Sequence, residues 1–524
     1  MRKSFLLFVL LSISTIVMTG CSKNDDVNTE ETDSDSGSDD SDIETDDNAR
    51  TSAVHENASD YVYNVSEAST ISLNGNSVTS TSSKVTITGT TATITAAGIY
   101  SVSGSLTNGQ LIVDADGATV KIILNGVTLS NSSTSPFYIK KSLKTIIFLT
   151  ENTTSTFTDA SVYAATGEPN ATIFANCDLS IAGNGKMVVN GKYADGISSD
   201  DGLIIKSGTI EVTATDDAIR GKDYLIVRDG TINATATTGQ AMKSDYTADA
   251  NFGYITIDKG TYVLTSSTRD GLHASHNITL NGGTLSVSAL SSQGGNAETS
   301  FTLDGATLSV TKCKEGIESG LIALKNGTLT ITATDDALNA TKGVGGEASD
   351  GSSLVISGGN INLYSSSGDA IDSNGNFTMS GGTVLAHGPQ SQPEVVMDVN
   401  GTSTISGGTI IASGPNSGQM IETFGNSSTQ NSVLIKFSQS KTANSIVHIE
   451  DNNGNNLSTF APVRNYYYLI FSSSDLIKGN SYNVYTGGSS SGNVSNGLYT
   501  GGSYTPGTKL GTFTVSGSVT LVNL

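Results

Sequence analysis

The feature that most constrains this 524-residue chain is a phrase that recurs between about residues 170 and 425. Copies read DGISSDDGLIIKSGTIEVTAT from Asp195, DAIRGKDYLIVRDGTINATAT from Asp217 and DGLHASHNITLNGGTLSVSAL from Asp270. Most copies open with an acid, a small residue and then Ile or Leu, at positions 171, 195, 217, 240, 270, 293, 315, 336, 369, 394 and 419. The intervals cluster at 21–25 residues, and such a period with strand-type composition predicts a stack of β-coils.

Each copy contains three short strand-like segments, and Gly-Gly or Asn-Gly pairs mark the corners between them. A single coil cannot bury its inward Ile, Leu, Val and Ala residues, so neighbouring coils must pair in parallel, about 4.8 Å apart. Two longer intervals fit surface insertions at Tyr246–Gly253 and Thr341–Ser352. The LxxLxLxxN signature of leucine-rich repeats is absent. The predicted fold is therefore all-β, a parallel β-helix with coils of about 22 residues.

The two ends of the chain depart from this period. Strand segments between 59 and 169 are irregularly spaced and predict the N-terminal coils and cap of the same helix, which makes 59–425 the β-helix domain. After Asn426 the period stops, and short alternating segments predict a small C-terminal antiparallel β module over 426–524. Its tyrosine run at 466–468 could form a sugar-stacking surface, although core or edge aromatics are the simpler interpretation.

The first 20 residues predict a lipoprotein signal peptide. Arg2 and Lys3 precede the apolar run Phe5–Leu11, which is too short for a membrane span. The closing MTGC resembles a bacterial lipobox, so we expect lipidation of Cys21; a plain secretory cleavage nearby is the alternative. The expected location is the outer membrane, with contact to the bilayer through the lipid anchor only.

An acidic segment follows, and we expect residues 21–58 to be a disordered tether. Residues 22–50 carry twelve Asp and Glu against Lys23 and Arg50, with almost no bulky apolar side chains. The SKNDD after Cys21 resembles the surface-export signals of Bacteroidetes lipoproteins, which predicts a protein facing the cell surface; a plain solvated linker is the alternative.

The charge of the remaining body restricts its partners. Residues 22–50 hold −10 and the signal peptide +2 of the net −22, which leaves −14 for residues 51–524. An acidic body argues against nucleic acid or an anionic membrane surface and favours cations or metal-bridged ligands. Cys177 and Cys313 lie about six coils, roughly 30 Å, apart and cannot form a disulfide. We expect a monomer.

Several stretches resemble a known family. The run ATIFANCDLSIAGNGKMVVNGKYADGISSDDGLIIKSGTIEVTATDDAIRGKDYLIV at 171–227 is similar to the carbohydrate-binding domain-containing β-helix proteins of bacterial cell surfaces. So are LNGVTLSN at 124–131 and LYTGGSYTPGTKLGTFTVSG at 498–517. The resemblance implies a right-handed parallel β-helix shaped like the pectate lyases. It also implies bound calcium and binding of polygalacturonate or other plant cell-wall polysaccharide without established catalysis.

The opening acids themselves indicate a metal site. Opening residues of successive coils stack within about 5 Å, where unscreened carboxylates repel and a hard cation with oxygen ligands relieves the repulsion. We predict calcium at two groups of acids: Glu315, Asp335, Asp336, Asp369 and Asp372, and the smaller Asp195, Asp216 and Asp217. The alternative is that each aspartate caps its own corner through backbone N–H groups.

The residue three positions after each opening defines what we call the outward column: Ser198, Arg220, Lys243, His273, Asn296, Glu318, Asn339 and Asp372. Its first half is basic and its second half acidic. Arg220, Lys243 and His273 could pair directly with a polyuronate laid along the stack. Alternatively, Arg220 and Lys243 neutralise Asp216, Asp217 and Asp245 on a solvated face.

Three classes of function fit these patterns. The chain lacks Trp, has few aromatics on the stack, and no coil is richer in polar residues than the others. We therefore expect a non-catalytic, surface-tethered polysaccharide-binding protein for acidic, uronate-containing glycans such as pectin. A β-helix polysaccharide lyase or hydrolase is one alternative, with Arg220 beside Asp216 and Asp217 as a candidate lyase pair. An adhesin or scaffold for a protein partner is the other.

Overall fold

A computed structural model describes residues 55–346 and 348–524. The predicted signal peptide, Cys21 and nearly all of the predicted tether therefore lie outside the described residues. Apart from the 3-10 turns η1 (Ala58–Tyr61), η2 (Val65–Glu67) and η3 (Gly418–Met420), the elements are β-strands. Among these residues, no helix has the length and apolar character needed to cross a membrane.

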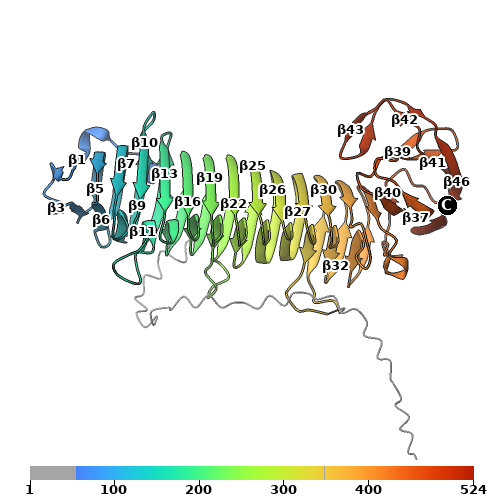
Figure 1. Cartoon of the computed structure of the whole chain (residues 1–524), viewed down its shortest axis with the longest axis horizontal. Coiled ribbons are helices and arrows are strands. Elements are labelled where there is room, and N and C mark those ends of the chain that lie inside the picture. Colours follow the sequence, from blue (N-terminus) through green and yellow to red (C-terminus); the bar gives the residue numbers. More distant parts are fainter. Residues whose placement is uncertain (1–54, 347) are drawn as a thin grey trace, which may run out of the picture.

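Coils with three strands each form the body of the molecule, as Figure 1 shows for the long row of stacked arrows. Strands β14 (Asp195–Ser199), β15 (Gly202–Ile205) and β16 (Thr209–Ala214) pair in parallel with β17 (Ile219–Gly221), β18 (Tyr224–Val227) and β19 (Thr231–Ala236). The predicted all-β fold with a large parallel, β-helix-like sheet is confirmed, whereas the right-handed sense of the coil stays a prediction.

The coil strands fall on three faces. The first face, which carries the outward column, contains β8 (Phe137–Lys141), β11 (Ala171–Ala175), β14, β17, β20 (Met242–Ser244), β23 (Leu272–Ala274), β28 (Leu338–Ala340), β31 (Ile371–Ser373) and β34 (Met397–Val399). The second contains β9 (Lys144–Leu149), β12 (Asp178–Gly183), β15, β18, β21 (Tyr254–Ile257), β24 (Asn277–Leu280), β29 (Ser353–Ile356), β32 (Asn376–Met379) and β35 (Ser403–Ile405). The third contains β10 (Thr154–Thr158), β13 (Lys186–Gly191), β16, β19, β22 (Thr261–Ser266), β25 (Thr284–Ala289), β30 (Asn360–Ser365), β33 (Thr383–His387) and β36 (Thr409–Gly414). The long strands β26 (Gly295–Cys313) and β27 (Ile317–Ala333) bend through all three faces.

Aliphatic side chains fill the inside of the stack because alternate residues of each strand point inward. On the first face, Ile219, Met242 and Leu272 occupy equivalent inward positions and are fully buried. The two predicted insertions leave the pairing intact, because β20 still pairs with β23 and β28 with β31. Cys177 and Cys313 are buried free thiols, in agreement with the sequence argument.

The predicted period is wrong at its C-terminal end. Ile371 pairs with Met397 and Asp372 with Asp398, so the residue opposite Asp369 is Val395, one position after the predicted opening at 394. The predicted opening at 419 starts no further coil strand, because in the described chain only η3 lies between β36 and β37.

The N-terminal end of the stack begins with two short antiparallel pairs, β1 (Ser69–Gly75) with β2 (Val78–Ser80) and β3 (Val85–Thr88) with β4 (Thr91–Ile94). Parallel coil pairing is established with β5 (Gly98–Leu106), β6 (Gln110–Asp114) and β7 (Thr119–Ser130).

A separate C-terminal module stays a prediction, but the structure does have strands after Asn426, and most of them pair antiparallel. They are β37 (Ser432–Lys441), β38 (Val447–Asp451), β39 (Asn456–Phe460), β40 (Tyr466–Ser472), β41 (Ser481–Thr486), β42 (Ser489–Ser490), β43 (Asn493–Ser495), β44 (Leu498–Thr500), β45 (Tyr504–Thr505), β46 (Thr508–Thr514) and β47 (Val519–Asn523). Strand β40 pairs with both β37 and β36, so the coil sheet continues directly into these strands.

A buried histidine lies where the coil meets the C-terminal strands. The His387 ring is fully buried, stacks on Tyr364 with ring centroids 4.8 Å apart, and lies 5.4 Å from the Phe460 ring. Its Nε2 is 3.4 Å from the Asn496 carbonyl oxygen. Burial lowers the pKa of His387 to about 4.

Candidate carbohydrate and metal site

Strand pairing confirms the outward column as one continuous line. Ser198 pairs with Arg220, Arg220 with Lys243, Lys243 with His273 and His273 with Asn296. Beyond them the line runs through Glu318, Asn339, Asp372 and Asp398. Before Ser198 it starts with Tyr138 and Phe174. The line therefore changes along the stack from aromatic to basic and then to acidic.

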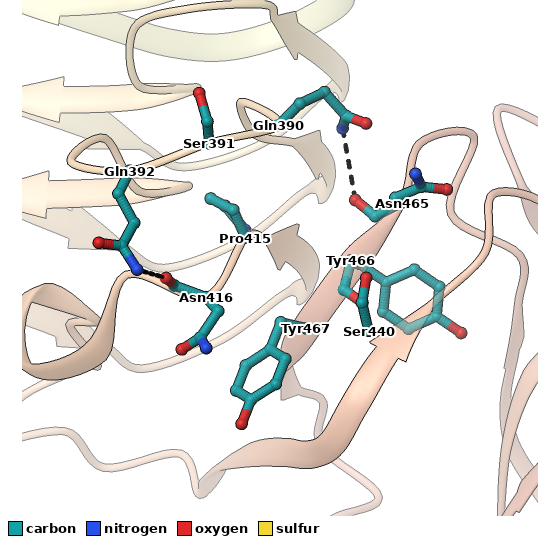
Figure 2. A pocket seen from close by; sticks show the side chains of 9 residues that line it. All are labelled: Gln390, Ser391, Gln392, Pro415, Asn416, Ser440, Asn465, Tyr466 and Tyr467. Carbon is teal, nitrogen blue, oxygen red and sulfur yellow. Dashed lines mark hydrogen bonds between the residues drawn. The ribbon is translucent and has the colours of Figure 1, made fainter.

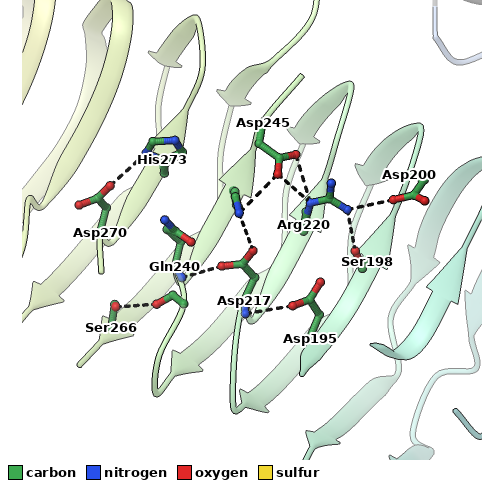
Figure 3. A network of polar contacts seen from close by, with 12 residues as sticks. Asp195, Ser198, Asp200, Asp217, Arg220, Gln240, Asp245, Ser266, Asp270 and His273 are labelled. Carbon is green, nitrogen blue, oxygen red and sulfur yellow. Dashed lines mark hydrogen bonds and ion pairs between the residues drawn. The ribbon is translucent and has the colours of Figure 1, made fainter. Parts of the chain in front are cut away.

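Arg220 is held by the carboxylates of the chain itself (Figure 3). Its Nε donates to both oxygens of Asp245 at 3.1 Å, and its Nη1 donates to Asp200 Oδ1 at 3.0 Å and to Ser198 Oγ at 3.3 Å. Only 14% of the side chain is exposed. Burial alone would lower the pKa of Arg220, but Asp245 and Asp200 raise it above its ordinary value.

The next two basic residues of the column are paired in the same way. Lys243 Nζ lies 3.2 Å from Asp217 Oδ2 and 3.4 Å from Asp245 Oδ2. His273 Nδ1 lies 3.0 Å from Asp270 Oδ2. These contacts favour the interpretation in which the basic half neutralises nearby acids, and they include the predicted partners Asp217 and Asp245. Direct pairing of Arg220, Lys243 and His273 with a uronate stays a prediction.

The opening acids cap backbone N–H groups at the corners of the stack. The sequence predicted that each acid would cap its own corner, whereas the N–H groups belong to the following coil. Five of the opening aspartates each accept the backbone N–H of the equivalent residue in the following coil: Asp217 N to Asp195 at 3.1 Å, Gln240 N to Asp217 at 2.7 Å, Gln293 N to Asp270 at 3.2 Å, Asp369 N to Asp336 at 2.6 Å and Val395 N to Asp369 at 2.7 Å. The acids thus cap the corner of the next coil rather than their own, and they fasten adjacent coils together. The opening position needs an acceptor for this reason alone.

One predicted group of acids comes together as expected. Oxygens of Asp195, Asp216 and Asp217 lie within 4.8 Å of one another. Burial, followed by the neighbouring Asp217 carboxylate, raises the pKa of Asp195 well above its ordinary value. The positive charge of Lys243, paired with Asp217, offsets part of the repulsion in this group.

The second close group contains a residue that the sequence analysis missed. Oxygens of Asp369, Asp372 and Asp398 lie within 4.8 Å of one another, and Asp369 is 1% exposed. We call these three residues the distal acid triad. Asp398 was missed because the outward column was followed only as far as Asp372 and the next opening, at 394, was set one residue early. The available signal was the dipeptide Met397-Asp398, an apolar residue followed by an acid as in Ile371-Asp372, with which it pairs.

The other predicted ligands lie beside the distal acid triad rather than in it. Asn339 Nδ2 donates to Glu315 Oε2 at 3.2 Å, and Lys314 Nζ lies 3.6 Å from Glu315 and 4.0 Å from Asp335. Burial and then the Glu318 carboxylate raise the pKa of Glu315 to about 8. Burial raises the pKa of Asp336 well above its ordinary value, with further contributions from Asp372 and Asp369. This end of the column therefore crowds acidic groups whose charged forms repel one another, and a cation would relieve that repulsion.

Comparison with known proteins finds relatives for part of the chain. Residues 88–348 match the family model described as "Carbohydrate-binding domain-containing protein". A curated protein with this description from Acetivibrio thermocellus is 34% identical over 125 residues, which are 23% of this chain and 44% of the relative, so the match spans less than half of the relative's length. A solved structure of the polysaccharide lyase-like protein from C. thermocellum, a gadolinium derivative, aligns with a TM-score of 0.42 at 26% identity and covers 47% of this chain and 97% of the other. The family model thus covers just under half of the chain, and over residues 88–348 the chain is similar to carbohydrate-binding domain-containing proteins.

Proposed function

We propose that this protein is a non-catalytic polysaccharide-binding lipoprotein. In this proposal it acts as a monomer, is anchored to the outer membrane, faces the cell surface and binds acidic plant cell-wall glycans such as polygalacturonate through calcium. The family-model match of residues 88–348 supports a carbohydrate partner. The observation that carries the finer proposal is the distal acid triad, where three carboxylates from two adjacent coils converge at the acidic end of the outward column.

Calcium suits this group of side chains. It takes six to eight oxygen ligands in flexible geometry, and three carboxylates leave coordination positions for a uronate carboxylate and water. Repulsion among Asp369, Asp372 and Asp398 is relieved by a divalent cation, and an acidic polymer that is itself repelled by the body of the chain needs such a bridge. Calcium would thus act as the link between two sets of carboxylates.

The raised pKa values of Arg220 and Lys243 support binding rather than catalysis. A lyase needs a strong base, which must be unprotonated when it removes a proton. Burial alone would lower the pKa of Lys243, but Asp217 and Asp245 raise it above its ordinary value, as Asp245 and Asp200 do for Arg220. Arg220 pairs with Asp200 and Asp245, not with Asp216 and Asp217 as the lyase alternative supposed.

The test is polygalacturonate binding by the full chain, measured calorimetrically in millimolar calcium and in EDTA. We expect binding only with calcium, and Asp398→Asn should weaken it about tenfold or more, which corresponds to about 1.4 kcal/mol. Glu394→Gln is the matched control, because this acid lies close in sequence but outside the triad. Equal affinity in EDTA, or an unaffected Asp398→Asn variant, would remove calcium bridging at this site.

The same preparations test the absence of catalysis. We expect no unsaturated products and no new reducing ends from polygalacturonate between about pH 5 and 10. Turnover at an ordinary enzymatic rate, on the order of 1 per second, would instead establish the lyase or hydrolase alternative.

A further inference from the structure

A cavity of about 290 Å³ lies where the last coils meet strand β40, outside the segment that matches the family model. Figure 2 shows the side chains around it, which come from the loop after β33, the loop after β36, strand β37, strand β40 and the residue just before β40. The lining residues are Gln390, Ser391, Gln392, Pro415, Asn416, Ser440, Asn465, Tyr466 and Tyr467.

The tyrosine run at 466–468 contributes two lining residues to this cavity, Tyr466 and Tyr467, and only Tyr467 has a partly exposed side chain. Successive side chains of a strand point to opposite faces. Tyr466 and Tyr468 are 1% and 0% exposed, and the Tyr466 hydroxyl donates to the Ser445 carbonyl at 2.9 Å. Tyr467, between them, is partly exposed and lines the cavity. Two of the three tyrosines are therefore core residues, and one is available for stacking.

The polar groups of the cavity are amides and hydroxyls. Gln390 Nε2 donates to the Asn465 carbonyl at 3.3 Å, and Gln392 Nε2 donates to the Asn416 carbonyl, which fixes both amide planes. Within residues 55–346 and 348–524, the side chains of Asn416, Ser391 and Tyr467 have no hydrogen-bond partner. No lining residue is a carboxylate or a basic group.

This chemistry fits an uncharged sugar. Each sugar hydroxyl both donates and accepts, and an amide offers both functions from one planar group. A tyrosine ring supplies an apolar face for the C–H side of the sugar and a polar hydroxyl at its rim. A uronate would leave its charge without a partner here, in contrast to the acidic end of the outward column. The volume lies at the lower limit of small-molecule pockets, about 300 Å³, which suits one sugar residue.

We propose that this cavity is a second carbohydrate subsite that binds one uncharged sugar residue without metal. Tyr467 stacks on the sugar ring, and the amides of Asn416, Gln390 and Gln392 hydrogen-bond its hydroxyls. The subsite is separate from the calcium-dependent site proposed above, and it would let the protein hold a neutral side chain or segment of a polymer whose acidic part binds elsewhere.

The test is saturation-transfer NMR on the full chain in EDTA. The probes are the methyl glycosides of glucose, galactose, xylose and arabinose, with methyl galacturonate glycoside as the acidic comparison. We expect transfer from at least one neutral glycoside, and loss of affinity by about tenfold or more in Asn416→Ala and in Tyr467→Ala. Tyr467→Phe keeps the ring and should lose less than Tyr467→Ala. Tyr499→Ala removes a tyrosine that does not line the cavity and should bind as the unmodified chain does.

Two outcomes would overturn the proposal: transfer from no neutral glycoside, whether or not the galacturonate glycoside binds, or neutral binding unchanged in both alanine variants. Thermal unfolding of each variant separates a folding defect from a binding defect, and the exposed Asn416 keeps the test valid if Tyr467→Ala unfolds. Asp398→Asn should leave neutral binding unchanged, so failure of this subsite and failure of the calcium site are distinguished.

Discussion

Mild acid should weaken the junction between the coil stack and the C-terminal strands through His387. This imidazole is fully buried between Tyr364 and Phe460, and its pKa is about 4 in the folded chain against 6.5 as the ordinary value. The replacement His387→Phe keeps a flat ring in the stack and removes the titration. It loses only the 3.4 Å contact between Nε2 and the Asn496 carbonyl.

The sign and size of the effect follow from linkage. Above pH 6.5 the ring is neutral in both states, and no stability is lost. As the pH falls from 6.5 towards 4, the unfolded chain binds a proton that the folded chain does not, so the free energy of unfolding decreases. At 1.36 kcal/mol per pKa unit, the difference amounts to about 3 kcal/mol at pH 4.

The assay is thermal unfolding of the unmodified chain and His387→Phe at pH 7.5, 5.5 and 4. Other groups also titrate in this range, but they do so in both proteins, and the difference between them isolates His387. We expect the unmodified chain to lose about 3 kcal/mol more than the variant, or a few degrees in Tm. Tyr364→Phe, a control in the same stack, should lose stability in parallel with the unmodified chain. If His387→Phe loses as much stability on acidification as the unmodified chain, buried His387 does not resist protonation and the reasoning is refuted.

Two further predictions concern the coil. Arg220→Ala should lower the free energy of unfolding by about 3–5 kcal/mol in a denaturation assay, because it leaves the partly buried Asp245 and Asp200 without their guanidinium partner. As the control, replacement of the exposed Lys325 by alanine should change the free energy of unfolding by less than about 0.5 kcal/mol. Equal effects of the two replacements would mean that the ion pairs of Arg220 add nothing to stability. Gly368→Ala should lower Tm and reduce the free energy of unfolding by about 1–3 kcal/mol, because the new Cβ would lie 2.3 Å from Asp336 Oδ1 and 2.4 Å from Asp335 Oδ1. Gly517→Ala is the control and should be tolerated, since no atom lies within 4 Å of its Cβ position. An unchanged Tm for Gly368→Ala would show that this corner can open.

The sequence by itself determined the stack and its register over most of its length. A strand has a side-chain period of two, so a one-residue shift would expose the whole inward row, and the repeat therefore fixes which residues stack. The order Ser198, Arg220, Lys243, His273 followed from this spacing alone and is the order of the paired strands. The register failed at 394, where an acid one residue before the true opening imitated the repeat, and the opening predicted at 419 starts no coil strand.

Only the tertiary structure decided what the charged side chains contact. Asp200 lies outside the opening position and the outward column, so no period places it on Arg220, and Asp245 was only one of three candidate acids until the structure placed it there. The hydrogen bonds that opening aspartates accept from the next coil, and the convergence of Asp398 on Asp369 and Asp372, depend on how corners of adjacent coils are offset. The cavity around Tyr467 likewise requires β40 to pair with the last coil strand β36, a contact between segments about 60 residues apart that no local pattern encodes. The sequence of each repeat encodes its own pattern of burial, whereas contacts between non-equivalent loops arise only when the coils are stacked.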